Sequence, residues 1–452
     1  MENGKTNHTA HVVVLPFNGQ GHVNPMLQFS KRLAFKGLKI TFAATLSITK
    51  TMQSGNEAIS FFSIFDDTND GYGGPGGVQG YIQRFQDSVR NSLRKLVNDL
   101  KDTDNPAKCL VYDSSLAWAL DLAKELGLVG ASFFLQSCSA VAAYYPFHLK
   151  FSGKKEKVSP FPMPGLPKLG LPTSAGGSYD SPVIKAIASI YDNIEKADWI
   201  LLNTYHELEE EVIKWWEQFS RVRAIGPNVP SVYIDKRLPN DTDYGFNLFK
   251  PNSDACMHWL NEKAPQSVVY VSFGSCASIK PEQLKELTWA LRLFNKPFLW
   301  AIKSSEANKL PDNFVEETKD KGLLVDWCSQ MEVLAHKAVG CFITHCGTNS
   351  IVESLIFGVP MVGIPVFLDQ TVNGYFMEKF WKVGITPKMD EEKGISPREE
   401  IEEAITIVMD EERGKEIKEN TMRLKDCAKK ALEEGGSSDK HIDEFIADLV
   451  RS

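Results

Sequence analysis

The segment WCSQMEVLAHKAVGCFITHCGTNSIVESLIFGVPMVGIPVFLDQ, residues 327–370, decides the fold that we expect for this chain of 452 residues. Val339–Thr344 and Pro360–Pro365 are short apolar runs that predict buried strands. Between them, Ser350–Phe357 carries apolar residues at helical spacing. Strand, turn, helix and strand in this order form the unit from which parallel α/β sheets are built.

The start of the predicted helix suits an anion. Asn349 or Ser350 is placed as N-cap, and Gly358 is placed to end the helix. The free backbone N–H groups and the positive dipole end of a helix N-terminus attract phosphate. His345 adds a side-chain donor there, and Glu353 lies one turn along, where it suits a ribose diol.

An aromatic residue opens the segment and a polar pair closes it. Trp327 follows the apolar run 322–326, so it lies at the carboxyl end of a predicted strand, the edge where parallel sheets bind ligands. Asp369 and Gln370 end the segment. This combination favours a nucleotide-sugar over a packed core.

The rest of the chain alternates strands and helices twice, which predicts two parallel sheets with flanking helices that face one another across a cleft. In the first half, helical periodicity over Asn24–Phe35 and Ser115–Leu126 separates strands at His11–Leu15, Leu38–Ala44, Lys108–Tyr112, Ala131–Leu135 and Trp199–Asn203. In the second half, strands are predicted at Ser267–Ser272, Pro297–Ile302, Leu323–Val325, Val339–Thr344 and Met361–Ile364. A Pro- and Asn-rich stretch over 226–251 suits an interdomain linker, and 159–179 suits a loop over a binding face.

A candidate general base lies in the first half. His22 follows the loop Gly19–Gly21 after the first predicted strand, and a histidine titrates near neutral pH. Asp113, at the end of another strand, can fix the tautomer of His22 and stabilise its protonated ring. Asp113 also suits the N-cap of the helix from Ser115, and the two roles are compatible.

Composition narrows the class of protein. A net charge of -8 and a pI of about 5.7 argue against a nucleic-acid or anionic-membrane partner. The sequence has no apolar run long enough to span a membrane. Its eight cysteines are scattered without a C-x-x-C pair, which favours reduced thiols in a cytoplasmic protein. An Asp-x-Asp pair at a strand end is lacking too, so we expect no metal.

Two other enzyme classes fit poorly. An NAD-dependent oxidoreductase needs G-x-G-x-x-G after its first strand, whereas residues 16–22 are PFNGQGH and the Gly-rich run 73–80 does not follow a predicted strand. A serine hydrolase needs a nucleophile elbow, and the glycine spacing of that motif is lacking around Phe273–Cys276.

Ordered motifs along the chain carry a family resemblance. Besides residues 327–370, they are PFNGQGHVNP at 16–25, VSFGS at 271–275 and GGSS at 435–438. Together they resemble the plant family-one UDP-dependent glycosyltransferases. The resemblance implies two facing Rossmann-like, doubly wound domains of GT-B type: an acceptor-binding domain over 1–237, a linker over 238–252, a UDP-sugar domain over 253–434 and a terminal helix over 435–452 that packs back on the first domain.

The resemblance also implies roles for individual residues. Trp327 would stack on uracil with Cys328 and Gln330 beside it, and Glu353 would bind the ribose. The pyrophosphate would be bound by Ser275, His345, Gly347, Asn349 and Ser350, and the sugar by Thr348, Asp369 and Gln370. The family usually has Trp at the position of Thr348, next to sugar and phosphate, so this chain departs from the pattern there.

The implied reaction is inverting transfer of glucose from UDP-glucose, without a metal or other cofactor, to a hydroxyl or carboxyl of a small lipophilic plant metabolite such as a terpenoid, steroid or phenolic. His22 would be the base and Asp113 its partner, in an enzyme expected to be monomeric. The residues expected to line the acceptor pocket are Phe17, Gly19, Trp118, Phe134, Ser137, Tyr144, Tyr145 and Phe367. Because Thr348 changes the donor segment, a non-catalytic or altered-donor binder of nucleotide-sugars or small molecules is the alternative.

Overall fold

The computed structural model describes residues 10–52, 57–65, 77–153, 162, 188–192, 194–219, 221–248, 251–275, 277–367, 369–390 and 392–451. The predicted loop over 159–179 lies outside these residues except at position 162, as does the start of the Gly-rich run 73–80.

The first half of the chain forms a seven-stranded parallel sheet in the order β3-β2-β1-β4-β5-β6-β7. The strand order reverses between β1 and β4, which is the point where open α/β sheets bind ligands. Its strands are β1 (His11–Leu15), β2 (Lys39–Thr45), β3 (Ile59–Phe65), β4 (Ala107–Asp113), β5 (Val129–Phe134), β6 (Trp199–Leu202) and β7 (Val222–Ala224).

The second half forms a six-stranded parallel sheet in the order β10-β9-β8-β11-β12-β13, with its reversal between β8 and β11. Its strands are β8 (Val268–Ser272), β9 (Phe298–Ala301), β10 (Gly322–Val325), β11 (Val339–Thr344), β12 (Met361–Gly363) and β13 (Gly384–Ile385). The prediction of two doubly wound α/β units is confirmed.

The sequence prediction found the central strands and the edge strand β10, and it missed β3, β7 and β13 at the other sheet edges. The strand HVVVL of β1 is buried along its whole length, as expected for a strand covered on both faces. β3 was missed because it is an edge strand with partly exposed residues. β7 and β13 span three and two residues, too short to give a periodic signal.

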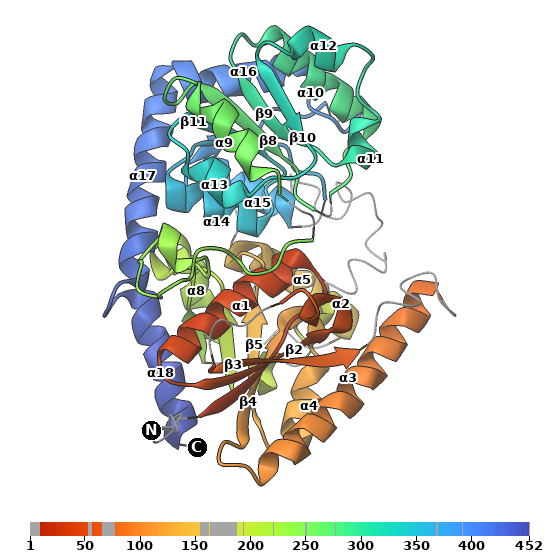
Figure 1. The fold of residues 1–452 in the computed structure, drawn as a ribbon, viewed down its shortest axis with the longest axis vertical. Coiled ribbons are helices and arrows are strands. Elements are labelled where there is room, and N and C mark those ends of the chain that lie inside the picture. The colour runs from red at the N-terminus through yellow and green to blue at the C-terminus, as the bar shows by residue number, and fades with distance from the viewer. Residues whose placement is uncertain are drawn as a thin grey trace.

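The helices flank both sheets (Figure 1). In the first half they are α1 (Gln20–Phe35), α2 (Leu46–Thr49), α3 (Gly77–Lys101), η2 (Ser114–Leu116), α4 (Ala119–Glu125), α5 (Cys138–Ser152), η4 (Ile194–Lys196) and α8 (His206–Trp216). After η5 (Ser231–Tyr233), the second half has α9 (Ser253–Asn261), α10 (Pro281–Leu293), α11 (Ser304–Ala307), α12 (Phe314–Thr318), α13 (Gln330–Ala335), α14 (Thr348–Phe357), α15 (Gln370–Lys379), α16 (Arg398–Asp410), α17 (Glu412–Leu432) and α18 (Ser437–Arg451).

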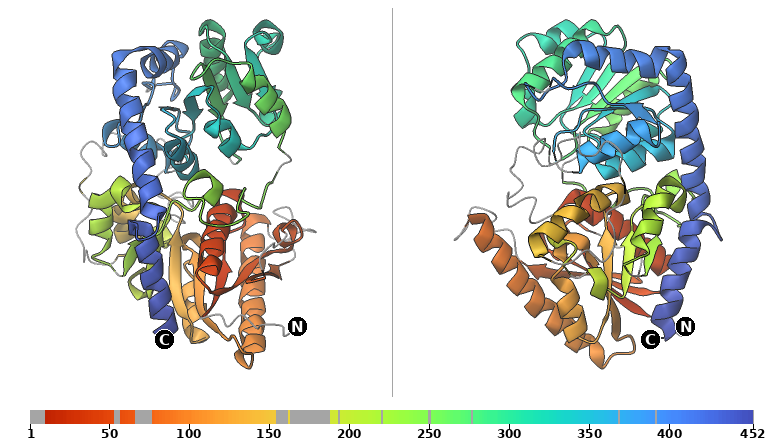
Figure 2. Two further views of the ribbon diagram at one scale, coloured as in Figure 1. Left: turned by 60° about the vertical axis from the view of Figure 1, so that its left-hand side comes forward. Right: turned by 180° about the vertical axis from the view of Figure 1, so that it is seen from behind.

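The two halves meet where α1 and α5 of the first approach α13, α14 and α15 of the second (Figure 1). Figure 2 shows α17 running along one side of both halves and α18 continuing beside the first sheet. Phe445 of α18 packs against Phe29 and Trp199, with ring centroids 6.3 and 5.6 Å apart. The chain therefore returns at its end to the core of its first half.

Candidate active site

The residues singled out from the sequence gather at the carboxyl ends of strands in both halves. His22 follows β1 and Asp113 ends β4, so this pair lies at the reversal point of the first sheet. Ser275 follows β8 and His345 follows β11, at the reversal point of the second sheet. Since α1 and α14 approach each other between the halves, the two sheet edges that carry these residues face one another (Figure 1).

His22 and Asp113 form a hydrogen-bonded pair. The Nδ1 atom of His22 lies 2.6 Å from Oδ2 of Asp113. The other oxygen of Asp113 accepts a bond from the backbone N–H of Ser115 at 2.9 Å, so the carboxylate also caps η2. Asp113 is fully buried, whereas 29% of the His22 side chain is exposed. Asp113 therefore fixes the imidazole through Nδ1, and part of the ring stays accessible to solvent.

The two groups shift each other's protonation. Burial alone would lower the pKa of His22, but the Asp113 carboxylate raises it above its ordinary value, with a smaller contribution from Asp369. Burial alone would raise the pKa of Asp113, but His22 and the bonds from Ser115 keep it below its usual range. An ionised Asp113 holds the proton of His22 on Nδ1, which leaves Nε2 able to accept one.

The phosphate-sized turn of the second half encloses an imidazole. His345 lies between two glycines: a Cβ on Gly347 would lie 2.5 Å from its Nε2, and one on Gly274 would lie 2.9 Å from its Cε1. Its Nδ1 is buried and has no hydrogen-bond partner among the described residues. Burial lowers the pKa of His345 to about 4, so the ring is neutral near pH 7. A neutral ring beside a helix start can donate one N–H to an anion.

The helix start differs from the sequence prediction. α14 begins at Thr348, with Gly347 as N-cap and no side-chain cap, so the prediction of Asn349 or Ser350 as N-cap is wrong. Both side chains bond elsewhere: Asn349 donates to the backbone oxygen of Gly21 at 2.8 Å, and Ser350 accepts from Gln330 at 3.0 Å. Gly358 ends the helix in the left-handed conformation, as predicted.

Glu353 lies at the centre of a buried polar cluster. Its two oxygens accept from the hydroxyl of Tyr244 and from Nε2 of Gln330, each at 2.7 Å. Burial raises the pKa of Glu353, and these two hydrogen bonds oppose the shift. Gln330 also accepts from the hydroxyl of Tyr270 at 3.3 Å, and that hydroxyl lies 3.4 Å from the sulfur of Cys328.

Asp369 and Gln370 lie at the start of α15. Oδ2 of Asp369 accepts from Nδ2 of Asn373 at 2.8 Å and from Oγ1 of Thr348 at 3.3 Å. Gln370 is buried, and its Oε1 accepts from the backbone N–H of Val366 at 2.9 Å. Its side-chain oxygen thus stabilises the turn before the helix.

Trp327 and Ser275 occupy loops that follow strands. Trp327 is half-buried after β10, and its carbonyl accepts from the backbone N–H of Asn252 at 2.9 Å. The carbonyl of Ser275, after β8, accepts from Lys303 at 3.1 Å. The neighbouring Cys276 lies outside the described residues.

Of the acceptor-pocket candidates, Phe17 and Gly19 lie beside His22. The ring of Phe17 packs against His22 at 5.2 Å, and Gly19 is the N-cap of α1. Trp118 carries the guanidinium of Arg90 over its ring, 4.9 Å from the centroid. Phe367 is half-buried before α15.

The other acceptor-pocket candidates are more deeply enclosed. Phe134 is fully buried against Trp216, and Tyr145 packs on Trp215, so the structure gives both a packing role in the core. The hydroxyl of Tyr144 is buried and has no hydrogen-bond partner among the described residues. Ser137 bonds across to the second half, as described below.

The sequence reasoning missed Tyr244 and Asn373. Tyr244 lies in the predicted linker over 226–251, and no local pattern connects it to Glu353, 109 positions away. Asn373 comes one helical turn after Asp369, and this i, i+4 spacing is the signal that points to their contact.

Within the described residues, no group of three or more His, Cys, Asp or Glu side chains is placed to hold a metal ion. None of the helices in the described part of the chain combines the length and the hydropathy that crossing a bilayer requires.

Two family models match the chain. One, described as UDP-glucoronosyl and UDP-glucosyl transferase, matches residues 230–431, and the other, described as Glycosyltransferase, N-terminal domain, matches residues 8–64. The chain is 42% identical to UDP-glucosyl transferase 74CD1 of Saponaria officinalis, over 96% of this chain and 97% of that protein. It is also 42% identical to the mogroside I-E synthase of Siraitia grosvenorii, over 100% of both chains.

Solved structures resemble the whole chain as well. The crystal structure of Os79 from O. sativa in complex with UDP superposes with a TM-score of 0.83 and 34% identity, covering 97% of this chain and 100% of that one. The same protein in complex with U2F and trichothecene gives a TM-score of 0.81 at 33% identity, with the same coverage.

Proposed function

The chain belongs to the plant family-one UDP-glycosyltransferases, and we propose that it transfers glucose from UDP-glucose, with inversion, to a hydroxyl or carboxyl group of a small lipophilic plant metabolite. The observation that carries the proposal is the contact of 2.6 Å between His22 and Asp113 at the reversal point of the first sheet, opposite the donor segment. A fully buried carboxylate behind a partly exposed imidazole is the arrangement of a general base.

The proposed reaction is a single displacement. Nε2 of His22 takes the proton of the acceptor hydroxyl, and the acceptor oxygen forms a bond to the anomeric carbon of glucose. The bond from that carbon to the phosphate oxygen breaks, and its electron pair leaves with UDP. Attack from the face opposite the leaving group inverts the anomeric configuration, so the product is a β-glucoside. Asp113 stabilises the protonated His22 until the proton passes to solvent.

The second half supplies the donor site in this proposal. The N-terminus of α14 and the neutral ring of His345 meet the charge that grows on the leaving phosphate. Glu353 binds the ribose and Trp327 stacks on uracil. Asp369 and Gln370 bind the glucose hydroxyls. These roles are assigned as the resemblance of the donor segment to its family implies.

A lipophilic acceptor is supported by the aromatic surroundings of the base and by the relatives. Phe17 packs on His22, and Trp118 follows η2, the short helix that Asp113 caps. One solved structure of a related protein contains a trichothecene. The proposal includes a monomeric enzyme in the cytoplasm, and the scattered cysteines without a C-x-x-C pair favour that reducing compartment.

The test is a mass-spectrometric screen of the purified protein with several UDP-sugars and a panel of terpenoid, steroid and phenolic acceptors. We expect a mass gain of one hexose with UDP-glucose, and proton NMR of the product should show a β-anomeric signal. The His22→Ala variant should lose turnover and keep its affinity for UDP. Binding of UDP-glucose without transfer by the wild-type protein would favour the alternative of a non-catalytic binder, and transfer of another sugar alone would favour an altered donor.

A further inference from the structure

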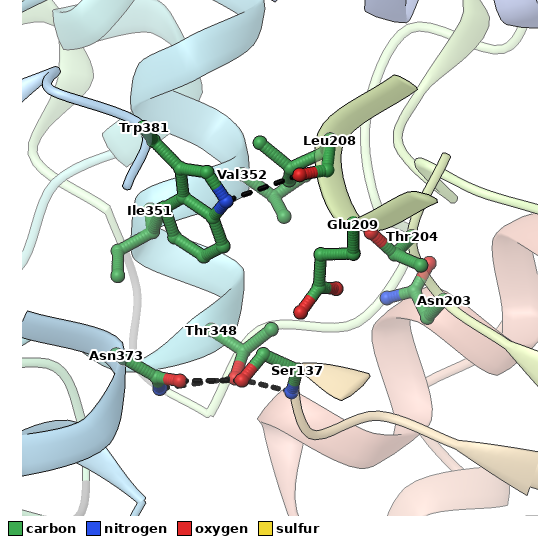
Figure 3. Close-up of a pocket in the computed structure, with 10 residues that line it drawn as sticks. All are labelled: Ser137, Asn203, Thr204, Leu208, Glu209, Thr348, Ile351, Val352, Asn373 and Trp381. Atoms are coloured by element: carbon green, nitrogen blue, oxygen red, sulfur yellow. Dashed lines mark hydrogen bonds between the residues drawn. The ribbon is translucent and has the colours of Figure 1, made fainter. Parts of the chain in front are cut away.

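A polar contact joins the two halves beside the donor segment. Ser137 precedes α5 in the first half, and its Oγ donates to Oδ1 of Asn373 in α15 of the second half at 2.6 Å. The backbone N–H of Ser137 donates to Oγ1 of Thr348 at 3.2 Å. Figure 3 shows these three side chains converging at the lower edge of a small cavity between the halves.

The amide of Asn373 has one orientation in this contact. Its Nδ2 donates to the carbonyl oxygen of Cys346 at 2.9 Å and to Oδ2 of Asp369 at 2.8 Å. Because both partners can only accept, the amide oxygen must point to Ser137. Asn373 is fully buried and Ser137 is 4% exposed, so water does not compete for these bonds. A directed chain of bonds therefore runs from Ser137 through Asn373 to Asp369.

Thr348 closes the same network from the side. Its hydroxyl accepts from Ser137 and lies 3.3 Å from both Nδ2 of Asn373 and Oδ2 of Asp369. An indole could not take this place, since it donates one hydrogen bond and accepts none. The position at which this chain departs from the usual Trp of its family is thus one where the hydroxyl has three polar neighbours.

We propose that Ser137, Thr348 and Asn373 form an interdomain bridge that orients Asp369 toward the donor sugar, with Ser137 and Asn373 as positioning residues for the reaction. The proposal rests on the proposed function, since it assigns Asp369 to the sugar. Thr348 and Asn373 both donate to Oδ2 of Asp369, and Ser137 of the first half bonds to both of them, so contact between the halves fixes the orientation of these two donors. Donor binding is thereby coupled to the approach of the first half, which carries the base.

If the bridge orients Asp369, its loss should weaken the binding of UDP-glucose and leave the binding of UDP unchanged. UDP has no glucose and does not reach Asp369 in the proposed site, whereas UDP-glucose does. A merely structural interface would alter the binding of both ligands together, because its loss would disturb the whole donor half.

The experiment compares the KM for UDP-glucose with the Kd for UDP in Ser137→Ala, Thr348→Val and Asn373→Ala. We expect each variant to raise the KM for UDP-glucose about three- to tenfold, as the loss of one or two buried hydrogen bonds does, and to leave the Kd for UDP within about twofold. Ser137→Thr and Thr348→Ser keep the hydroxyl and should stay close to the wild type. Ser137→Ala combined with Asn373→Ala should cost less than the product of the two single effects, because both remove the same chain of bonds.

Ser139→Ala is the matched control. Ser139 lies in the same turn of α5 and is fully buried, but its hydroxyl bonds to Glu209 within the first half, at 2.7 Å. This variant should lower thermal stability without changing the KM for UDP-glucose. Equal changes in the KM for UDP-glucose and the Kd for UDP, or no change in either, would overturn the bridge.

The variant Asp369→Asn distinguishes failure of the bridge from failure of the assignment of Asp369 to the sugar. If this variant raises the KM for UDP-glucose and the bridge variants do not, the bridge is refuted and the proposed function stands. If Asp369→Asn leaves the KM unchanged, the assignment of Asp369 to the sugar fails, and the bridge fails with it.

Discussion

Asp113→Asn is the substitution that tests the proposed base most directly. It removes the charge 2.6 Å from Nδ1 of His22 and keeps the size of the side chain. A hydrogen bond to a charged group contributes about 1.5–3 kcal/mol, so losing it alone slows the reaction about 10- to 100-fold. The amide that replaces the carboxylate can donate to Nδ1, which moves the ring proton to Nε2, where the acceptor proton should go. We therefore expect kcat/KM to fall by about 10³-fold or more.

The pH profile gives a second readout with a definite sign. Burial lowers the pKa of His22 and Asp113 raises it, with the net shift upward in the wild type. The base is active when neutral, so the wild-type rate falls as pH drops through this raised pKa. Without Asp113 the burial effect is left largely unopposed, and the acid limb of kcat/KM should move to lower pH. The linked effect on folding has the same origin: stabilisation by protonated His22 is complete below the unfolded pKa of about 6.5 and is lost as pH rises through the folded pKa.

The assay is the rate of UDP release, measured across pH with an acceptor found in the screen. Asp235→Asn is the control, because Asp235 is also a fully buried carboxylate in an ion pair, with Arg32 at 2.7 Å, but lies away from the base. The control should lose thermal stability and keep the position of its acid limb. An Asp113→Asn enzyme whose kcat/KM stays within about threefold of the wild type, or whose acid limb does not move, would refute the assigned role.

Three further substitutions test the donor half. Trp327→Ala should weaken UDP binding, measured by calorimetry, by about 1–3 kcal/mol because the stacking on uracil is lost. An unchanged Kd for UDP would exclude the stacking role. Tyr244→Phe removes the hydroxyl that donates to Glu353 at 2.7 Å and should weaken UDP binding by about 1 kcal/mol. The affinity for 2′-deoxy-UDP should change less, and equal losses of affinity for both nucleotides would contradict the role of Glu353 at the ribose. Gly347→Ala places a Cβ 2.5 Å from His345, so it should displace the ring and raise both the Kd for UDP and the KM for UDP-glucose; kinetics like those of the wild type would show that the ring position is unimportant.

Local sequence patterns were enough to predict the central strands and the helix α14, which follows the turn at His345–Gly347. Val339–Thr344 is a strand with the predicted bounds, and Gly358 ends α14 as predicted. The predicted N-cap of that helix was wrong by two or three residues because Gly347 serves as N-cap without a side chain, which leaves Asn349 and Ser350 free to bond elsewhere. Helix ends are decided by such competing bonds.

The sequence by itself determined the parallel α/β architecture and the residues at the ends of its strands, because apolar periodicity and turn-forming residues act over a few neighbouring positions. The tertiary structure decided which of these residues meet. Asp113 reaches His22 across 91 positions, and Asn373 reaches Ser137 across 236. These contacts depend on the order of strands within a sheet and on how two sheets face one another. Those arrangements arise from the burial of whole faces, so no local pattern encodes them.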